Sequence, residues 1–167
     1  MIIAGTGHRP DKLGGYGDEV KHALDRVATS WLSSNRPAGV ISGMALGWDQ
    51  ALARAAISLG IPLLAALPFK DQDRKWPARS REDFADILGK AMQVVVVSEG
   101  GYSAHKMQLR NEYMVDKCDS LLALWNGAPG GTANCVSYAN RVGRPVTNLW
   151  SAFRPGNFPD AFQFPWS

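Results

Sequence analysis

One arginine and one glycine turn carry the clearest chemical signal in this 167-residue chain. Arg110 lies between Met107 and Met114 at steps of three and four residues, which places the three side chains on one face of a helix. Residues 129–132 read Pro-Gly-Gly-Thr, a turn in which the glycines free the backbone and the threonine can open a helix. A guanidinium beside backbone N–H groups suits a phosphate, so a phosphorylated nucleotide is the first ligand to consider.

A second glycine turn follows another apolar segment. Residues 42–49 read Ser-Gly-Met-Ala-Leu-Gly-Trp-Asp and lead into an alanine-rich helix, whose free N–H groups favour an anion. Asp49 either caps this helix or binds a sugar hydroxyl. A tight turn without a ligand explains the stretch equally well. Two such turns in one sheet favour a binding site.

The other polar candidates each have two interpretations. His8 and Arg9 follow the first apolar segment, where they contact a substrate or simply lie at the surface. Glu112 and Asp116 are one helical turn apart, and such a carboxylate pair either performs acid–base work or forms a solvated face. The polar and aromatic loop 71–76 either covers a base or is a plain surface loop.

Three familiar nucleotide and hydrolase motifs are missing from the sequence. No G-x-x-x-x-G-K-[ST] loop occurs, which argues against a P-loop ATPase or GTPase. The run Gly5–Gly7 is followed by Pro10 rather than by a third glycine and a helix, so the dinucleotide fingerprint is not met. The chain also lacks the G-x-S-x-G elbow that carries the nucleophile of a hydrolase triad.

Short apolar segments alternate with amphipathic helices along the chain. The expected strands are residues 1–5, 39–42, 62–67, 94–97, 120–125 and 145–149. The run 94–97 is valine throughout, which predicts a strand with both faces covered. The alternation predicts an α/β, Rossmann-like doubly wound sheet, mainly parallel, with helices on both faces. In such sheets the loops after the strands converge on one crevice.

Length and composition place limits on the organisation. The chain fits one domain over residues 1–150, followed by a Pro- and aromatic-rich tail, 151–167, expected to pack on the domain or on a partner subunit. A net charge of +3 gives only a weak indication of nucleic-acid binding. Two cysteines, without metal-type spacing, predict neither a disulfide scaffold nor a metal site. No signal peptide or membrane-spanning run is evident, so we expect a cytoplasmic protein without a cofactor.

The order of these motifs resembles the YpsA-type branch of the SLOG superfamily, which includes the LOG enzymes and the recombination protein DprA. The resemblance extends from Thr6 to about Ala139 and includes Leu67-Pro68-Phe69 and the run 110–116. It implies a Rossmann-like sheet, a nucleotide-derived ligand and often a dimer or higher oligomer. The motifs together give the candidate ligand-binding residues, which are Thr6, Gly7, His8, Arg9, Ser42, Gly43, Met44, Gly47, Asp49, Arg110, Asn111, Gly130, Gly131 and Thr132.

The chain departs from the LOG pattern at the position that matters for hydrolysis. The LOG signature M-x-x-R-K-x-x-M matches at Arg110, with Asn111 in place of the lysine. The second LOG signature, P-G-G-x-G-T-x-x-E, matches in part at residues 129–132, where this chain has a shorter spacing. When the two are aligned on Gly131-Thr132, Cys135 takes the position of the catalytic glutamate. A thiol stabilises an oxocarbenium-like transition state poorly. Hydrolysis by that route needs another carboxylate, which makes the candidate catalytic residues Arg110, Asp49, Glu112 and Asp116.

Three functions follow from the resemblance and the residues. The first is a protein that senses or sequesters a nucleoside phosphate or an ADP-ribose-like signal, and the loss of the glutamate favours it. The second is a LOG-like N-glycosidase acting on nucleoside monophosphates. The third is DprA-like binding of single-stranded DNA, with Trp48, Trp76 and Tyr102 as stacking aromatics. The mild net charge makes nucleic acid the weakest of the three.

Overall fold

Six short strands form one sheet in the computed structural model, which describes residues 1–153. All the strand pairs are parallel, and the order across the sheet is β4-β3-β2-β1-β5-β6. The strands are β1 Ile2–Gly7, β2 Gly39–Ser42, β3 Leu63–Leu67, β4 Gln93–Val96, β5 Ser120–Leu124 and β6 Val146–Asn148. The predicted Rossmann-like α/β class is thus confirmed. Most of the tail expected at 151–167 lies outside the described residues.

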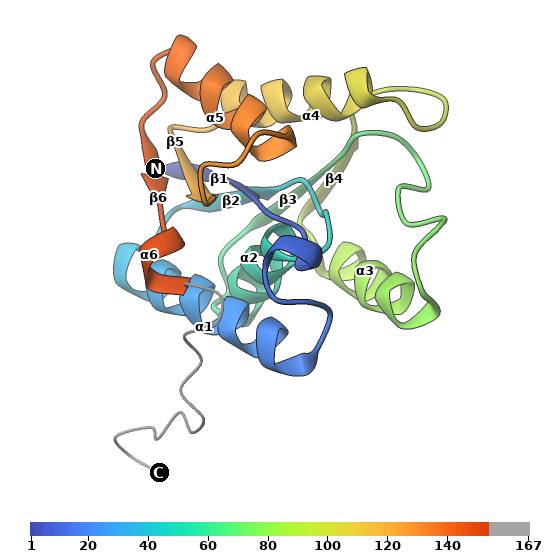
Figure 1. Cartoon of the computed structure of the whole chain (residues 1–167), viewed down its shortest axis with the longest axis horizontal. Helices are drawn as coiled ribbons and strands as arrows, with labels where there is room; N and C mark the ends of the chain where they lie inside the picture. The colour runs from blue at the N-terminus through green and yellow to red at the C-terminus, as the bar shows by residue number, and fades with distance from the viewer. Residues whose placement is uncertain (154–167) are drawn as a thin grey trace.

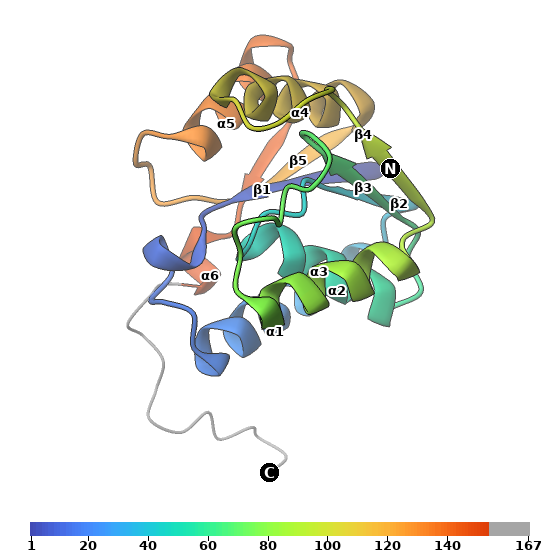
Figure 2. The ribbon, with the colours of Figure 1, turned by 90° about the vertical axis from the view of Figure 1, so that its right-hand side faces the viewer.

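Helices cover both faces of this sheet. The first three pack on one face, and α4 and α5 pack on the other (Figure 1; Figure 2). A 3-10 turn, η1, follows β1, and α6 lies beside α1 (Figure 1). The helical segments are η1 Pro10–Lys12, α1 Asp18–Asn35, α2 Trp48–Ser58, α3 Ala78–Lys90, α4 Ala104–Lys117, α5 Gly131–Arg141 and α6 Trp150–Phe153. Within residues 1–153, no helix combines the length and the apolar character needed to span a bilayer.

The topology reverses direction at β1. The chain builds β2, β3 and β4 outward on one side of β1, and then returns through α4 to place β5 on its other side. The β1–β5 register runs from Ile3 opposite Ser120 to Gly7 opposite Leu124, so the two strands end together. In open α/β sheets a ligand crevice forms at the carboxyl ends of the strands beside such a switch point. The fold therefore predicts a ligand site at the loops after β1 and β5.

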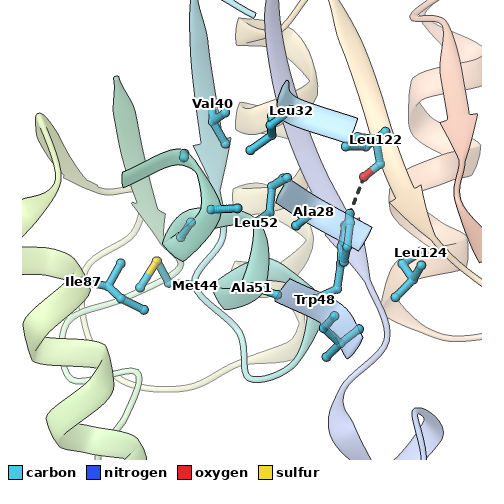
Figure 3. Close-up of a cluster of buried hydrophobic side chains, with 14 of the residues drawn as sticks. Ala28, Leu32, Val40, Met44, Trp48, Ala51, Leu52, Ile87, Leu122 and Leu124 are labelled. Carbon is cyan, nitrogen blue, oxygen red and sulfur yellow. Dashed lines mark hydrogen bonds between the residues drawn. The ribbon is translucent and has the colours of Figure 1, made fainter. Parts of the chain in front are cut away.

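A buried tryptophan packs beneath this end of the sheet. Trp48, at the start of α2, is fully buried, and its indole Nε1 donates a hydrogen bond to the carbonyl oxygen of Leu122 at 3.4 Å (Figure 3). A Cβ at Gly7 would lie 2.6 Å from the Cβ and Cγ of Trp48. Only a glycine at position 7 therefore lets the indole pack this closely against the end of β1.

The expectation that the valine run 94–97 is covered on both faces is wrong. β4 lies at the edge of the sheet, and Val94 and Val96 are 43% and 48% exposed. The helix that crosses this face, α4, packs on β1 and β3. Because a run of valines has no periodicity, its sequence alone does not distinguish a central strand from an edge strand.

Candidate functional site

A cavity of about 400 Å³ lies at the carboxyl ends of β1 and β5. It is lined by residues from the end of β1 and the loop after it, the start of α2, the N-terminal half of α4 and the start of α5. The lining includes these residues singled out from the sequence: Thr6, Gly7, His8, Arg9, Asp49, Arg110, Asn111, Gly131 and Thr132. Segments far apart in the chain thus meet at the switch point of the sheet.

Arg110 is the buried cation of this cavity. It lies on the face of α4 that turns toward β1 and is 4% exposed. Its Nε donates to Oδ1 of Asn111 at 3.0 Å, and its Nη1 donates to the carbonyl oxygen of Gly43. Burial lowers the pKa of the guanidinium, while the charge of Asp49 opposes that shift. The hydrogen bonds fix the plane of the guanidinium at the cavity wall, so it does not snorkel to solvent.

Asp49 is the buried acid of the cavity. It is the second residue of α2, and its Oδ2 accepts a hydrogen bond from the backbone N–H of Ala45 at 3.3 Å. The carboxylate therefore fastens the preceding loop instead of capping the first turn of its helix. Burial raises its pKa to about 6, outweighing the opposing effects of the Arg110 charge and the Ala45 hydrogen bond. A carboxyl group with this pKa can exchange a proton near neutral pH.

The glycine turn after β2 builds the wall behind these two groups. Ser42 Oγ donates to the carbonyl oxygen of Asp49 at 2.7 Å and accepts from the N–H of Met44 at 3.1 Å. A Cβ at Gly43 would lie 2.6 Å from Cζ of Arg110 and 2.9 Å from Oδ2 of Asp49. The candidates that do not line the cavity are Ser42, Gly43, Met44, Gly47 and Gly130. The close approach of Arg110 and Asp49 explains why position 43 is a glycine.

The start of α5 forms the opposite wall. Gly130 has a φ of 140°, and no side chain caps the helix at this residue. Nδ2 of Asn111 donates to the carbonyl oxygen of Gly131 at 3.4 Å, which ties α4 to this turn. Nζ of Lys12 lies 3.9 Å from the point where a Cβ on Gly130 would stand. An uncapped helix start with a lysine beside it attracts anions.

His8 and Arg9 occupy the loop after β1. Nε2 of His8 lies 2.7 Å from Oδ1 of Asn126, and its ring packs edge-on against Trp150 with centroids 5.7 Å apart. Burial lowers the pKa of His8, although the hydrogen bond to Asn126 opposes this, and the lowered pKa favours the neutral imidazole. Arg9 is exposed, and among residues 1–153 no carboxylate forms a salt bridge with it.

The structure places the other two candidate acids outside the cavity. Glu112 accepts a hydrogen bond from Nε2 of Gln108 at 3.0 Å, and Asp116 accepts one from the hydroxyl of Tyr138 at 2.9 Å. Both groups lie on the side of α4 that faces α5, and neither lines the cavity. Of the candidate carboxylates, only Asp49 lies beside Arg110.

Cys135 lies behind the cavity wall. It belongs to α5, is fully buried and forms a hydrogen bond with the side chain of Thr6. Burial raises the pKa of its thiol to about 12, although the Thr6 hydrogen bond and the Arg110 charge lower it. The thiol is therefore neutral and packs as a small apolar group.

Sequence reasoning missed several polar residues that line the cavity. Lys12 falls in the turn after Pro10, Gln108 is half-buried on α4, and Asn134 is exposed on α5. Lys12 carries a cation next to the predicted His8–Arg9 loop, and that proximity was the one signal that could have identified it. Nothing in the local pattern distinguishes Gln108 or Asn134 from ordinary surface residues.

A parallel doubly wound sheet with a cavity at its switch point defines a Rossmann-like class of ligand-binding folds. Within this class the chain belongs to the family described as the YspA SLOG family, whose model, YpsA, matches residues 3–140. This confirms the resemblance to the SLOG superfamily inferred from the motifs.

Two relatives agree with this assignment. The SPbeta prophage-derived protein YoqJ of Bacillus subtilis (strain 168) is 32% identical over 140 residues, covering 74% of this chain and 82% of that protein. A UPF0398 protein of Bacillus cereus (strain G9842) is 28% identical over 165 residues, covering 91% of this chain and 89% of that protein.

The structural neighbours share the fold at low identity. DNA processing protein A from Helicobacter pylori, described with a single-stranded DNA binding mode, matches with a TM-score of 0.64 and 18% identity. That match covers 89% of this chain but 64% of the neighbour, so the chain spans less than two thirds of its length. The molybdenum cofactor carrier protein from Chlamydomonas reinhardtii matches with a TM-score of 0.57 and 16% identity, and the match covers 88% of this chain and 74% of the neighbour.

Proposed function

We propose that this protein binds a nucleotide or a nucleotide-derived phosphorylated ligand in the cavity at the switch point, as a sensor or a sequestering protein. The observation that carries the proposal is the convergence of Arg110, Lys12 and the uncapped start of α5 on one hollow. Guanidinium, ammonium and helix N–H groups are the donors that bind phosphate. Asp49, on the same wall, suits a ribose hydroxyl or a base N–H.

Isothermal titration calorimetry with AMP, ADP-ribose and adenosine tests the proposal. The two phosphorylated probes should bind, and adenosine should bind at least about tenfold more weakly because it lacks the phosphate. Arg110→Ala should abolish binding. Since Arg110 is buried and its loss can disturb folding, Lys12→Ala is the second variant, and it should weaken AMP binding about tenfold.

Lys90→Ala is the matched control, because Lys90 is an exposed lysine whose partner, Asp86, lies on the same helix. It should bind AMP like the unaltered protein. The proposal fails if no phosphorylated probe binds, or if Lys12→Ala binds AMP as well as Lys90→Ala does.

Hydrolysis is the second candidate function, and the pKa of Asp49 favours it. In a LOG-like N-glycosidase the bond between the base and C1′ breaks, water adds to C1′ and the base takes up a proton. Asp49, with a pKa of about 6, is the one candidate acid beside Arg110 that could activate the water. Chromatography should then detect free base from nucleoside monophosphates. Release that persists at the full rate in Asp49→Asn would exclude this role.

DNA binding is the weakest candidate. DNA processing protein A supplies only the likeness of fold, and the net charge of this chain is +3. Single-strand binding should be strongly salt-dependent. A gel shift with an oligonucleotide at low salt tests it, and no shift would remove the candidate.

A further inference from the structure

A second hollow, of about 320 Å³, lies next to the main cavity. It is lined by Arg9, Tyr16, Leu46, Lys75, Trp76 and Pro77. These residues come from the loop after β1, the glycine turn after β2 and the loop that precedes α3. Each hollow alone is near the small end of the range for ligand pockets, about 300–1,000 Å³.

The two hollows share a wall. Arg9 lines both, and the neighbouring residues Ala45 and Leu46 line the main cavity and the second hollow respectively. The guanidinium of Arg9 is exposed, and its charge lowers the pKa of Asp49 within the main cavity. A ligand leaving the main cavity toward the second hollow would therefore pass this arginine.

The aromatic side chains of the second hollow are suited to stack on a planar ring. The rings of Trp76 and Phe84 form a T-shaped contact, with centroids 5.3 Å apart and planes at 83°, which holds the indole in place. Its backbone N–H donates to the carbonyl oxygen of Asp73 at 2.9 Å. Tyr16 is 68% exposed and follows two glycines with positive φ. Indole and phenol faces stack on nucleobases with little regard to sequence.

The charges of this hollow favour an anionic ligand. Arg9 and Lys75 are both exposed, and no acidic side chain of the described residues lines the hollow. Neither cation forms a salt bridge within residues 1–153. Two cations without a salt bridge beside two aromatic rings are suited to bind a nucleobase that is joined to phosphate. A purely apolar ligand would leave both positive charges without a partner.

We propose that the second hollow holds the base of a two-ended ligand. Its pyrophosphate bridge extends from the phosphate-binding groups of the main cavity to Arg9 and joins this base to a ribose-containing end in the main cavity. This inference rests on the proposed function, and it narrows the ligand from nucleotides in general to pyrophosphate-bridged ones. A mononucleotide fills the main cavity alone and leaves Tyr16, Lys75 and Trp76 unused.

Calorimetry with two probes tests this. AMP represents the one-ended ligand, and diadenosine 5′,5′-diphosphate represents the two-ended one. The two-ended probe should bind at least about tenfold more tightly, since stacking and an extra charge contact each contribute to affinity. Tyr16→Ala and Lys75→Ala should remove most of that gain and leave AMP binding unchanged. Both residues are exposed, so these variants should fold.

Tyr138→Ala and Lys90→Ala are the matched controls, because neither residue lines either hollow. Tyr138 lies in the second half of α5, and Lys90 is the last residue of α3. They should retain the full preference for the two-ended probe. Equal affinities for the two probes, or equal weakening of both by Tyr16→Ala, would overturn the inference while the proposed function stands. If neither probe binds, the proposed function fails as well. A ten-residue oligothymidylate that binds more tightly than the two-ended probe, through the same two residues, would assign the hollow to nucleic acid instead.

Discussion

Asp49 and Arg110 meet across Gly43. A Cβ placed on that glycine would lie 2.9 Å from the carboxylate Oδ2 and 2.6 Å from the guanidinium Cζ. The two charged groups therefore press against the backbone of one residue from different helices. Both are buried, and their charges partly offset the desolvation that each suffers. The cavity wall depends on the absence of a side chain at this position.

Gly43→Ala should disrupt the cavity. The added methyl group would displace Arg110 or Asp49, at a cost of about 1–3 kcal/mol in the free energy of unfolding. Binding of AMP should weaken at least about tenfold, because the guanidinium moves. Urea unfolding and calorimetry measure the two effects.

Gly89→Ala is the matched control for this substitution. Gly89 lies in α3 with nothing within 4 Å of its added Cβ, so alanine there should stabilise the helix by up to about 1 kcal/mol. Similar stabilities for the two variants would show that the contact across Gly43 carries no cost.

Asp49 should make stability depend on pH. Its pKa is raised from 3.8 to about 6 in the folded protein, so the folded state binds its proton more tightly than the unfolded state does. This contribution is fully present below pH 3.8 and is lost as the pH rises through 6. Relative to Asp49→Asn, the protein should therefore lose stability on the order of 3 kcal/mol between pH 4 and pH 7.

Urea unfolding of both proteins across that pH range measures the difference. Asparagine keeps an oxygen that can accept the N–H of Ala45, and it does not titrate, so the comparison isolates the carboxyl group. Parallel stability curves for the two proteins would contradict a raised pKa at this residue.

The two cysteines should resist alkylation in the folded protein. Cys118 and Cys135 are both buried, and burial raises the pKa of both thiols, that of Cys135 to about 12. Since the thiolate is the reactive form, iodoacetamide at pH 8 should add to neither. Mass spectrometry should find two adducts after unfolding in urea and none before. Rapid labelling of Cys135 in the folded protein would show that α5 opens.

The sequence predicted the site best where spacing alone determines position. The step from Met107 to Arg110 to Met114 placed the arginine on the inner face of its helix, and the structure buries it there. The alternation of strands and helices predicted the sheet. Both inferences rest on local periodicity, which the fold preserves.

The rest of the site depends on packing that no local pattern carries. Of the turn 42–49, Ala45 and Asp49 line the cavity, whereas Met44 and Gly47 do not. Lys12 reaches the start of α5 only because β1 and β5 are neighbours in the sheet. Glu112 and Asp116 share a helix with Arg110 but lie on the opposite side of it, toward α5. Which side of α4 faces the cavity depends on where α5 packs.

Trp48 should be the main support beneath the cavity floor. It is fully buried against Gly7, and its indole N–H bonds the carbonyl oxygen of Leu122 in the neighbouring strand (Figure 3). Trp48→Phe removes that donor and leaves space below β1, so the free energy of unfolding should fall by about 1–3 kcal/mol. Urea unfolding measures the loss.

Trp31→Phe is the control for the same change of side chain, because Trp31 is only half-buried on α1. It should cost less than Trp48→Phe, since solvent already reaches part of its ring. Because Gly7 also lines the cavity, Trp48→Phe should weaken AMP binding as well, whereas Trp31→Phe should not. Equal stabilities for the two variants would mean that the neighbouring residues close over the space, and the floor of the cavity would then not depend on the indole.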